Sequence, residues 1–289
     1  MANGVLGGRV CELIVGAVPP VGSFTPTQPN ALKIVDLRMS FSIEKDDKPQ
    51  PNRCEVSIYN LAPSSRQLLA SKGVRMILSA GYQGGSFGVI YAGDARYVNH
   101  LKENGVDWRT KIQAGDAERS FRFAFASQSF QPGTAVGQVV QRLVKVLGVD
   151  PGNVNDVAGQ LNDQHADGFV VHAPAGAALT EALRPYGYGW SVQDGRMQIL
   201  KESDVTAGQA VLISQSTGLI GSPEFGTNEK AKGPATLKVK SMLNAAFRVG
   251  GSIEVRSRGK NGFFRVKKLK HQGDTFGGDW FTELEAIPI

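Results

Sequence analysis

Cysteine and histidine are scarce in this chain, and their scarcity excludes several kinds of site. The 289 residues contain two cysteines and four histidines. A structural zinc site needs closely spaced Cys and His ligands, whereas no histidine here stands beside a cysteine or four residues from another histidine. Cys11 and Cys54 each occupy an apolar position of a predicted strand, so we expect buried free thiols, with a disulfide left open. We therefore expect no metal site and no cofactor.

Long hydrophobic runs and catalytic motifs are also missing. No apolar stretch approaches the roughly 20 residues that a membrane-spanning helix needs, and the first twenty residues lack the basic start and apolar centre of a signal peptide. The chain has no nucleophile elbow, no phosphate-binding Walker loop and no dinucleotide-binding fingerprint after a strand. We expect a protein that is made in the cytoplasm, does not insert into a membrane and is not an enzyme.

Negative charge is sparse in one segment. The net charge is +6, but Glu229 to His271 holds twelve Lys or Arg against two Glu, so the rest of the chain carries −4. Seven of these cations form a candidate basic interaction face: Lys238, Lys240, Arg256, Arg265, Lys267, Lys268 and Lys270. With nearby aromatic residues such a face suits a nucleic-acid backbone. A solvated face, or one that meets an acidic protein, is the interpretation we favour.

A hairpin near the start is the most regularly patterned stretch. Apolar and polar residues alternate from Val35 to Glu44 and again from Cys54 to Tyr59, the period of strands with one buried face. Further alternating stretches between Arg9 and Ala114 bring the total to six or seven antiparallel strands. The stretch Gly16 to Asn30 is predicted to be a loop or an arm that reaches a neighbour. Residues 1–118 are thus predicted to be an N-terminal arm and a first small β-barrel.

The pattern changes in the middle of the chain. Thr134 is a predicted N-cap before an apolar stripe that stops at Gly148, and a second helix is predicted over Ala177 to Leu183. A hairpin then turns at Asp194-Gly195, which makes residues 119–212 an α+β domain. Residues 213–233 are predicted to be linker-like. Strands return after them, and 213–289 is predicted to be a second β-barrel, so the fold class is mainly β with α+β.

One short repeat offers the only carboxylate pair that we considered. Ala-Gly-Asp-Ala occurs at 92–95 and at 114–117, so Asp94 and Asp116 stand in matching positions. A cell-wall hydrolase would use two such acids across a glycosidic bond. We favour the simpler interpretation, in which each Gly-Asp ends a strand in a turn and the aspartate satisfies the backbone locally.

The order of these features resembles a known family. The motifs are NRCEVSIYNL at Asn52 to Leu61, Ala80-Gly81-Tyr82, and VIYAGD at Val89 to Asp94. Gly133-Thr134 before a helix, the Gly189-Trp190 hairpin and the stretch Gly218 to Pro223 add to it. Together they resemble the tube-domain baseplate hub proteins of bacteriophage tails, a family that includes late control protein D and Mu-like hub proteins.

The resemblance implies an architecture and a location. Such hubs carry two tail-tube-like β-barrel domains and an α+β domain, and three copies form a pseudo-sixfold ring that joins a sixfold tail tube to a threefold spike. The expected partners are the tail tube protein, the central spike, other baseplate proteins and the tape measure protein. The expected place is the baseplate of the virion, where DNA passes through the lumen without specific binding, and the family has no catalytic residues to carry over.

Three alternatives to a hub were weighed. A nucleic-acid-binding module would use the basic C-terminal segment, and a cell-wall hydrolase would use Asp94 and Asp116. A spike component of a contractile injection system would share the fold.

Overall fold

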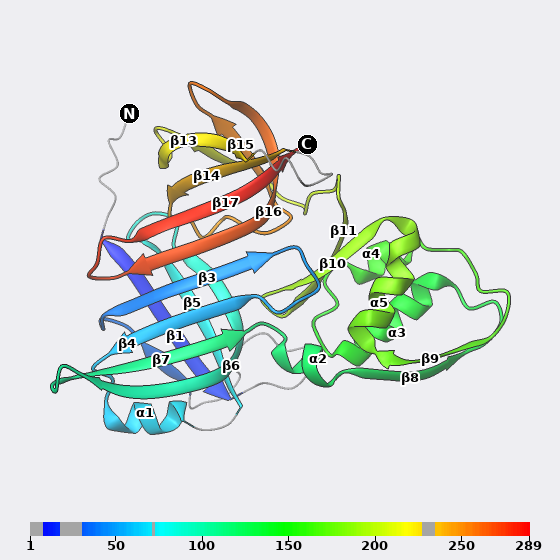
Figure 1. Ribbon diagram of the computed structural model, residues 1–289, viewed down its shortest axis with the longest axis horizontal. Coiled ribbons are helices and arrows are strands. Elements are labelled where there is room, and N and C mark those ends of the chain that lie inside the picture. The colour runs from blue at the N-terminus through cyan, green and yellow to red at the C-terminus, as the bar shows by residue number, and fades with distance from the viewer. Residues whose placement is uncertain (1–7, 18–30, 71–72, 227–234) are drawn as a thin grey trace.

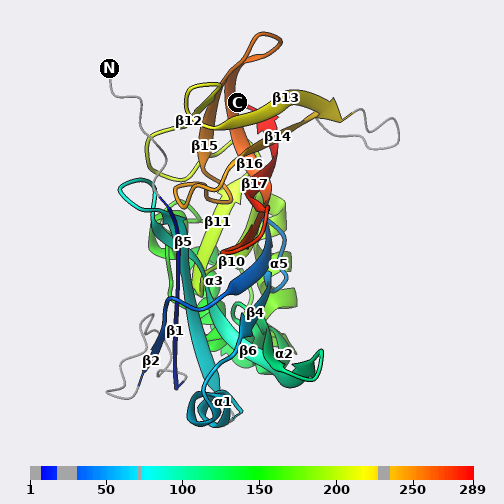
Figure 2. The same cartoon turned by 90° about the vertical axis from the view of Figure 1, so that its left-hand side faces the viewer.

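The structure is a computed structural model that describes residues 8–17, 31–70, 73–226 and 235–289. Most of the predicted N-terminal arm lies outside these residues. Figure 1 shows two groups of strands, one above the other, with a helix-rich unit to one side, and Figure 2 shows the same arrangement from the side. We call these parts the first β unit, the second β unit and the α+β unit.

The first β unit contains seven strands and one helix. These are β1 (Arg9–Ala17), β2 (Leu32–Ile34), β3 (Met39–Asp46), β4 (Arg53–Tyr59), α1 (Pro63–Leu69), β5 (Val74–Tyr82), β6 (Gly88–Glu103) and β7 (Asp107–Gly115). The second β unit contains β12 (Val211–Ser214), β13 (Leu219–Gly226), β14 (Thr236–Met242), β15 (Ser252–Arg256), β16 (Asn261–Asp274) and β17 (Trp280–Pro288).

The α+β unit is inserted between the two β units in the chain. It contains α2 (Glu118–Phe123), β8 (Phe125–Phe130), α3 (Val136–Leu147), α4 (Val154–Ala158), β9 (Phe169–Pro174), α5 (Ala175–Leu183), the short 3₁₀ helix η1 (Arg184–Tyr186), β10 (Tyr188–Gln193) and β11 (Arg196–Lys201). Strands β8 and β9 pair with each other, as do β10 and β11, and neither pair joins the large sheet in the described part of the chain.

The two β units share one 13-stranded sheet through β16. The first half of this strand pairs with β15, from Asn261 to Arg265, and the second half pairs with β3, from Lys268 to Asp274. A bulge between Val266 and Lys268 marks the change of partner, as expected where an extra residue bends a strand. The prediction of a mainly β fold is confirmed. The prediction of two separate barrels is not confirmed, because the strands run through a single sheet in the order β13-β14-β17-β16-β3-β4-β7-β6-β5-β1-β2.

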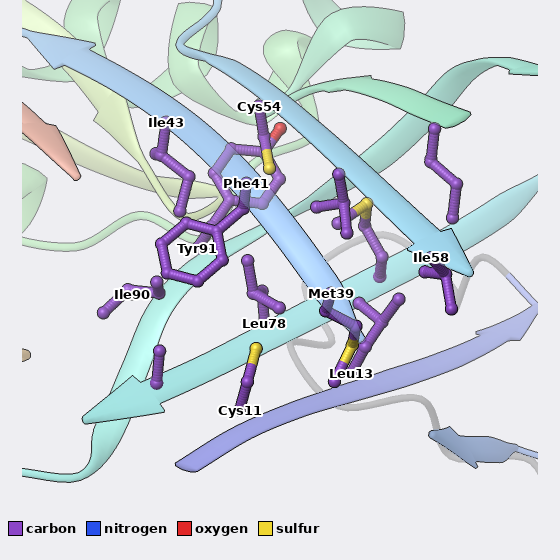
Figure 3. Packing of buried hydrophobic residues seen from close by; sticks show 14 of the residues in the cluster. Cys11, Leu13, Met39, Phe41, Ile43, Cys54, Ile58, Leu78, Ile90 and Tyr91 are labelled. Carbon is purple, nitrogen blue, oxygen red and sulfur yellow. The ribbon is translucent and has the colours of Figure 1, made fainter. Parts of the chain in front are cut away.

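Each unit has its own hydrophobic core. The core of the first β unit gathers the inward residues of its strands, and Figure 3 shows Met39, Phe41 and Tyr91 among them. Cys11 and Cys54 lie in this core as free thiols, so the prediction of buried free cysteines is confirmed. Trp280 of β17 belongs to the same core and stands edge-on to Phe41, with 5.4 Å between ring centroids. The first core is therefore closed by a residue of the second β unit.

Several predicted elements begin or end elsewhere. The strand predicted from Val35 starts only at Met39, because Asp36 has a φ of 58° and turns the chain. The helix predicted after Thr134 is confirmed and stops at Gly148 with a φ of 69°, but its N-cap is Ala135. The Thr134 hydroxyl donates backwards to the Gln131 carbonyl instead, at 2.6 Å.

The predicted linker at 213–233 is wrong for its described part. That stretch contributes the end of β12 and the whole of β13 to the large sheet. The polar and glycine-rich composition gives no strand pattern here, since β13 is an edge strand with no fully buried side chain.

Gly273 tests the packing that joins β16 to the first core. A Cβ at Gly273 would meet Phe41 Cζ at 2.4 Å and Trp280 Cε3 at 2.7 Å, closer than side-chain carbons approach. We expect Gly273→Ala to lower the free energy of unfolding by about 1–3 kcal/mol through overpacking, measured by urea denaturation. Gly278→Ala is the matched control because a Cβ there meets nothing within 4 Å. Equal effects of the two substitutions would contradict this account of the core.

Candidate functional surfaces

The predicted basic face falls into two groups along the strands of the second β unit. Lys238 and Lys240 lie on β14, and Lys268 and Lys270 lie on the half of β16 that pairs with β3. Register places these four lysines on one face of the sheet, because residues directly opposite each other in an antiparallel pair project to the same side. Arg265 stands opposite Ile287 of β17 and Arg256 opposite Asn261, both beyond the bulge of β16, and Lys267 lies in the bulge itself, so these three cations are separate from the four lysines.

The four lysines alternate with carboxylates in two rows that cross the strands. The first charge row consists of Glu224, Lys238, Glu285, Lys268 and Asp46. The second charge row consists of Lys240, Glu283, Lys270, Glu44 and Arg53. The two rows hold five positive and five negative side chains, so together the rows carry no net charge.

Contacts within the second charge row show this pairing directly. Lys240 Nζ lies 3.6 Å from Glu283 Oε1, and Lys270 Nζ lies 3.8 Å from Glu44 Oε1. Cross-strand pairs of opposite charge each stabilise a sheet by about 0.2–1 kcal/mol. The positive surplus counted between residues 229 and 271 is therefore balanced in the charge rows, because the acids of these rows lie outside that segment, on β3, β13 and β17.

The other three cations make ion pairs of their own. Arg256 Nε lies 2.7 Å from Glu254 on the same strand. Arg265 is 4% exposed and reaches Asp47, with Nη2 3.2 Å from Oδ2, and Lys267 reaches Glu202 at 3.2 Å. Burial is the largest influence on Asp47 and raises the pKa of its carboxyl, while Lys267 and Arg265 oppose the rise. The Arg265 and Lys267 contacts hold β16 to the β3–β4 loop and to the chain after β11.

Asp116 lies in a turn at the end of β7, as predicted, but Asp94 does not lie in a turn. Asp94 stands inside β6, with Oδ1 3.8 Å from Arg75 Nη1. Asp116 follows β7 and is 0% exposed, and it accepts hydrogen bonds from residues far along the chain rather than from its neighbours. The interpretation of local backbone satisfaction is wrong for both residues. A hydrolytic role has no support either, since a fully enclosed Asp116 cannot meet a substrate.

Asp116 belongs to a buried polar cluster that sequence reasoning missed. Its Oδ1 accepts the Asn52 backbone N–H at 2.8 Å, and its Oδ2 accepts Asn52 Nδ2 at 2.8 Å and the Asp194 backbone N–H at 3.0 Å. The Asp194 carboxylate accepts Lys45 Nζ at 2.6 Å and the Ala92 N–H at 2.9 Å. We call Lys45, Asn52, Asp116 and Asp194 the polar junction. It fastens the tip of the β10–β11 hairpin to the first β unit.

The local sequence explains why Asp194 can occupy that tip. Asp194 and Gly195 have φ values of 57° and 85°, the two positive angles of a type I′ hairpin turn, which confirms the predicted turn. The turn points the Asp194 carboxylate and backbone N–H out of the hairpin. The sequence around Asp194 predicts the Asp-Gly turn. It does not predict the contacts of Asp194 with Lys45, Ala92 and Asp116.

The histidines differ in burial, since His271 is buried whereas His165 and His172 are exposed. In the described part of the chain, no group of three or more His, Cys, Asp or Glu side chains is placed to hold a metal ion. His271 is fully buried, with Nδ1 2.8 Å from Thr282 Oγ1, and burial lowers its pKa to about 3. His165 lies against the Phe169 ring, with centroids 4.3 Å apart.

No helix among the described residues is long and apolar enough to cross a membrane.

Comparisons with known proteins find structural likeness only. No family model matches the chain, and no curated protein matches it. The 43 kDa tail protein of prophage MuSo2 from Shewanella oneidensis is similar over 96% of both chains, with a TM-score of 0.63 and 7% identity. The tail protein from Neisseria meningitidis MC58 is similar over 97% of this chain and 96% of its own, with a TM-score of 0.59 and 11% identity.

A third likeness is to a secretion system. An Escherichia coli component of the type VI secretion system, described as similar in structure to T4 bacteriophage tail proteins, has a TM-score of 0.56 and 12% identity. The similarity covers 88% of this chain and 74% of that one. At these identities the likeness shows the fold alone. The predicted resemblance to phage tail proteins is confirmed at that level.

His271 gives a pH-dependent prediction. The pKa of its imidazole is lower in the folded chain than the ordinary value. Between the two pKa values the unfolded chain therefore binds a proton at His271 and the folded chain does not. The free energy of unfolding consequently falls as pH falls from about 6.5 toward 3. Between pH 7.5 and 5 we expect the free energy of unfolding to fall by about 2 kcal/mol more in the wild type than in His271→Gln, measured by denaturant titration at both pH values. The control His172→Gln changes an exposed ring and should behave as wild type. An identical pH dependence in His271→Gln and wild type would contradict the assignment.

Proposed function

We propose that this chain is a structural hub protein of a phage tail baseplate, without enzyme activity. The observation that supports this most is the likeness to two phage tail proteins over nearly the full length of all three chains. A fold alone does not define a function, so the proposal also draws on what the surfaces are built to do.

The hub would assemble as a homotrimer. Each copy brings two β units, so three copies would present six β units around a central axis and could match a sixfold tail tube on one side and a threefold spike on the other. Continuity of the large sheet through β16 favours this role, because the two β units of one copy are held in fixed relation by backbone hydrogen bonds. The partners would be the tail tube protein, the central spike, other baseplate proteins and the tape measure protein.

DNA would pass through the lumen of this ring without specific binding. A wall that neutralised many phosphates would bind DNA strongly, since such contacts supply most of the non-specific affinity. The two charge rows place a carboxylate beside each lysine of this sheet face, which removes the positive field that a DNA-binding surface needs. The same balance weighs against the alternative of a nucleic-acid-binding module.

A spike component of a contractile injection system is the second candidate. It is favoured by the likeness to the Escherichia coli secretion component, which covers 74% of that longer chain. In that case the chain would act as the hub portion of a spike rather than as a separate baseplate protein.

The assembly state tests the proposal. The chain has a mass of 30.9 kDa, so light scattering on the purified protein should give three times that value, and negative-stain images should show rings with a central hole. A stable dimer would contradict the hub. A monomer that binds duplex DNA tightly at physiological salt would support the nucleic-acid-binding alternative instead.

The balance of the charge rows gives a prediction of its own. The double substitution Glu283→Gln and Glu285→Gln removes the acids of β17 that lie between the lysines of β14 and β16. We expect the wild type to show no measurable binding to a 30-base-pair duplex at about 150 mM salt. The variant should bind, and for each tenfold rise in salt its association constant should fall by about 0.9 log units per phosphate that it contacts. Fluorescence anisotropy measures both.

A matched control removes an acid elsewhere. Glu181→Gln on α5 separates an exposed pair with Arg184 and should leave DNA binding unmeasurable. Tight DNA binding by the wild type, or equal gains in the control and the double variant, would contradict the role assigned to the charge rows.

A further inference from the structure

Strands β8 and β9 form a two-stranded ribbon that has no third strand in the described part of the chain. One face of the ribbon packs on the core of the α+β unit through Ala126, Phe130, Phe169 and Val171. The residues of the opposite face pair across the strands as Phe125 with Pro174, Ser127 with His172, and Ser129 with Val170. A ribbon of only two strands has little stability of its own in water, so a further strand would have much to add here.

The outward face of the ribbon is apolar where solvent reaches it. Phe125 is 50% exposed and Val170 is 68% exposed. His172 lies between them along the ribbon, edge-on to the Phe125 ring with centroids 4.9 Å apart. Phe123, just before β8, is 73% exposed. Exposed apolar residues are ordinary when they are scattered, whereas several on one small surface mark a place where another molecule binds.

The backbone of β8 leaves a row of hydrogen-bonding groups on its open edge. The Ala175 N–H donates to the Ala124 carbonyl at 3.0 Å, just before the first pair of the ribbon. Bonded and non-bonded pairs alternate along an antiparallel ladder, so this bond sets the phase of the following pairs. The N–H and C=O of Phe125, Ser127 and Ser129 therefore point away from β9, and no strand among the described residues pairs with them.

This edge lacks the protection that other edges of the molecule have. Edge strand β13 carries Pro223 and a bulge between Ile220 and Glu224, and edge strand β2 is only three residues long. β8 reads Phe-Ala-Ser-Gln-Ser-Phe, with no proline, bulge or charge, and it runs along the border of the α+β unit (Figure 1). Proteins normally shield open edges with such devices, so their absence favours an edge that pairs with another chain.

Positive charge at the start of β8 indicates what kind of chain would pair there. Helix α2 exposes Arg119 and Arg122, and the Arg122 guanidinium lies 5.5 Å from the centroid of the Phe123 ring. Glu118, the acid of the same helix, already has a cation, because it lies 3.2 Å from Arg96. An acidic group on the partner would complement the two arginines. In an antiparallel added strand, that group stands at the C-terminal end.

We propose that β8 is a docking edge for an extended segment of another protein, which adds to the ribbon as an antiparallel third strand. Backbone bonds to Phe125, Ser127 and Ser129 would supply affinity, and side chains beside them would supply specificity. Apolar side chains would cover the Phe125 face, and acidic residues at the C-terminal end would meet Arg119 and Arg122. The surface belongs to the α+β unit alone, so the proposal does not rest on the hub assignment.

A second copy of the chain fits this edge less well than another protein. If two β8 strands paired antiparallel, the arginines of one copy would lie opposite the stretch that follows β8 in the other copy. Neither β8 nor residues 131–134 after it contain an acid. Such a pair would leave the positive charge of α2 without a complement.

A synthetic peptide tests the edge in the full chain. The probe is acetyl-Thr-Val-Thr-Val-Thr-Val-Glu-Glu with a free C-terminal carboxylate, and fluorescence anisotropy measures its binding. At a peptide concentration of about ten times Kd, amide exchange at Ser127 and Ser129 should slow about tenfold. The same peptide N-methylated at the nitrogens that face β8 is the control and should not bind. No binding at about 1 mM peptide, or equal binding of both peptides, would overturn the proposal.

A proline substitution tests the backbone contact from the side of the protein. Ser127→Pro removes an N–H that points away from β9, so no bond of the ribbon is lost, and we expect peptide affinity to fall at least about tenfold through the lost backbone bond. Ser127→Ala keeps the N–H and should bind as the wild type does. Unchanged affinity in a folded Ser127→Pro would contradict the docking edge. If that variant does not fold, the N-methylated peptide decides.

The charge of the partner is tested by a double substitution. Arg119→Gln with Arg122→Gln should weaken peptide binding by about three- to tenfold and reduce its dependence on salt. The control Lys145→Gln with Lys201→Gln removes two exposed cations elsewhere on the α+β unit and should change neither. Equal effects of the two pairs would count against an acidic partner. Dimers protected at 125–130 without peptide would show a second copy on this edge and overturn the proposal.

Discussion

Strand β16 is the element on which the arrangement of the β units depends. Its two halves pair with β15 and with β3, so backbone hydrogen bonds of one strand bind both β units. β17 runs beside nearly all of β16 and carries Trp280 into the first core. A connection of this kind has little freedom, because rotating one β unit against the other would break a row of backbone hydrogen bonds, and each buried group left unpaired would be costly.

Local patterns predicted many of the elements, and non-local pairing decided how they combine. Alternation identified the strands around Phe41 and Val56 because one face of each is buried. Nothing in that alternation shows that β3 pairs with a strand more than two hundred residues away. The prediction of two separate barrels followed from reading each group of strands by itself. Likewise the sequence predicts a linker where β13 lies, since an edge strand with a bulge and no fully buried side chain has no buried face to mark it.

The charge of a surface, like strand pairing, could not be predicted from local sequence. Counting along the sequence gave a basic segment, yet Lys268 and Lys270 stand opposite Asp46 and Glu44 of β3 and opposite Glu285 and Glu283 of β17. Charge along a strand becomes a surface property only after register is known. The hydrogen bonds of Asp116 could not be predicted from the sequence either, because its partners, Asn52 and Asp194, are 64 and 78 residues away. A short motif such as Ala-Gly-Asp-Ala carries no record of such partners.

The molecule thus uses two kinds of connection, and they differ in what can alter them. Backbone ladders join the β units, and no change of protonation can weaken a bond between an amide and a carbonyl. Side chains with ionisable groups join the α+β unit to the first β unit at Lys45, Asp116 and Asp194. The ladders hold the β units as one frame. The α+β unit is attached to that frame by side chains at the hairpin tip and, where the chain leaves β11, by Arg265 and Lys267 at Glu202.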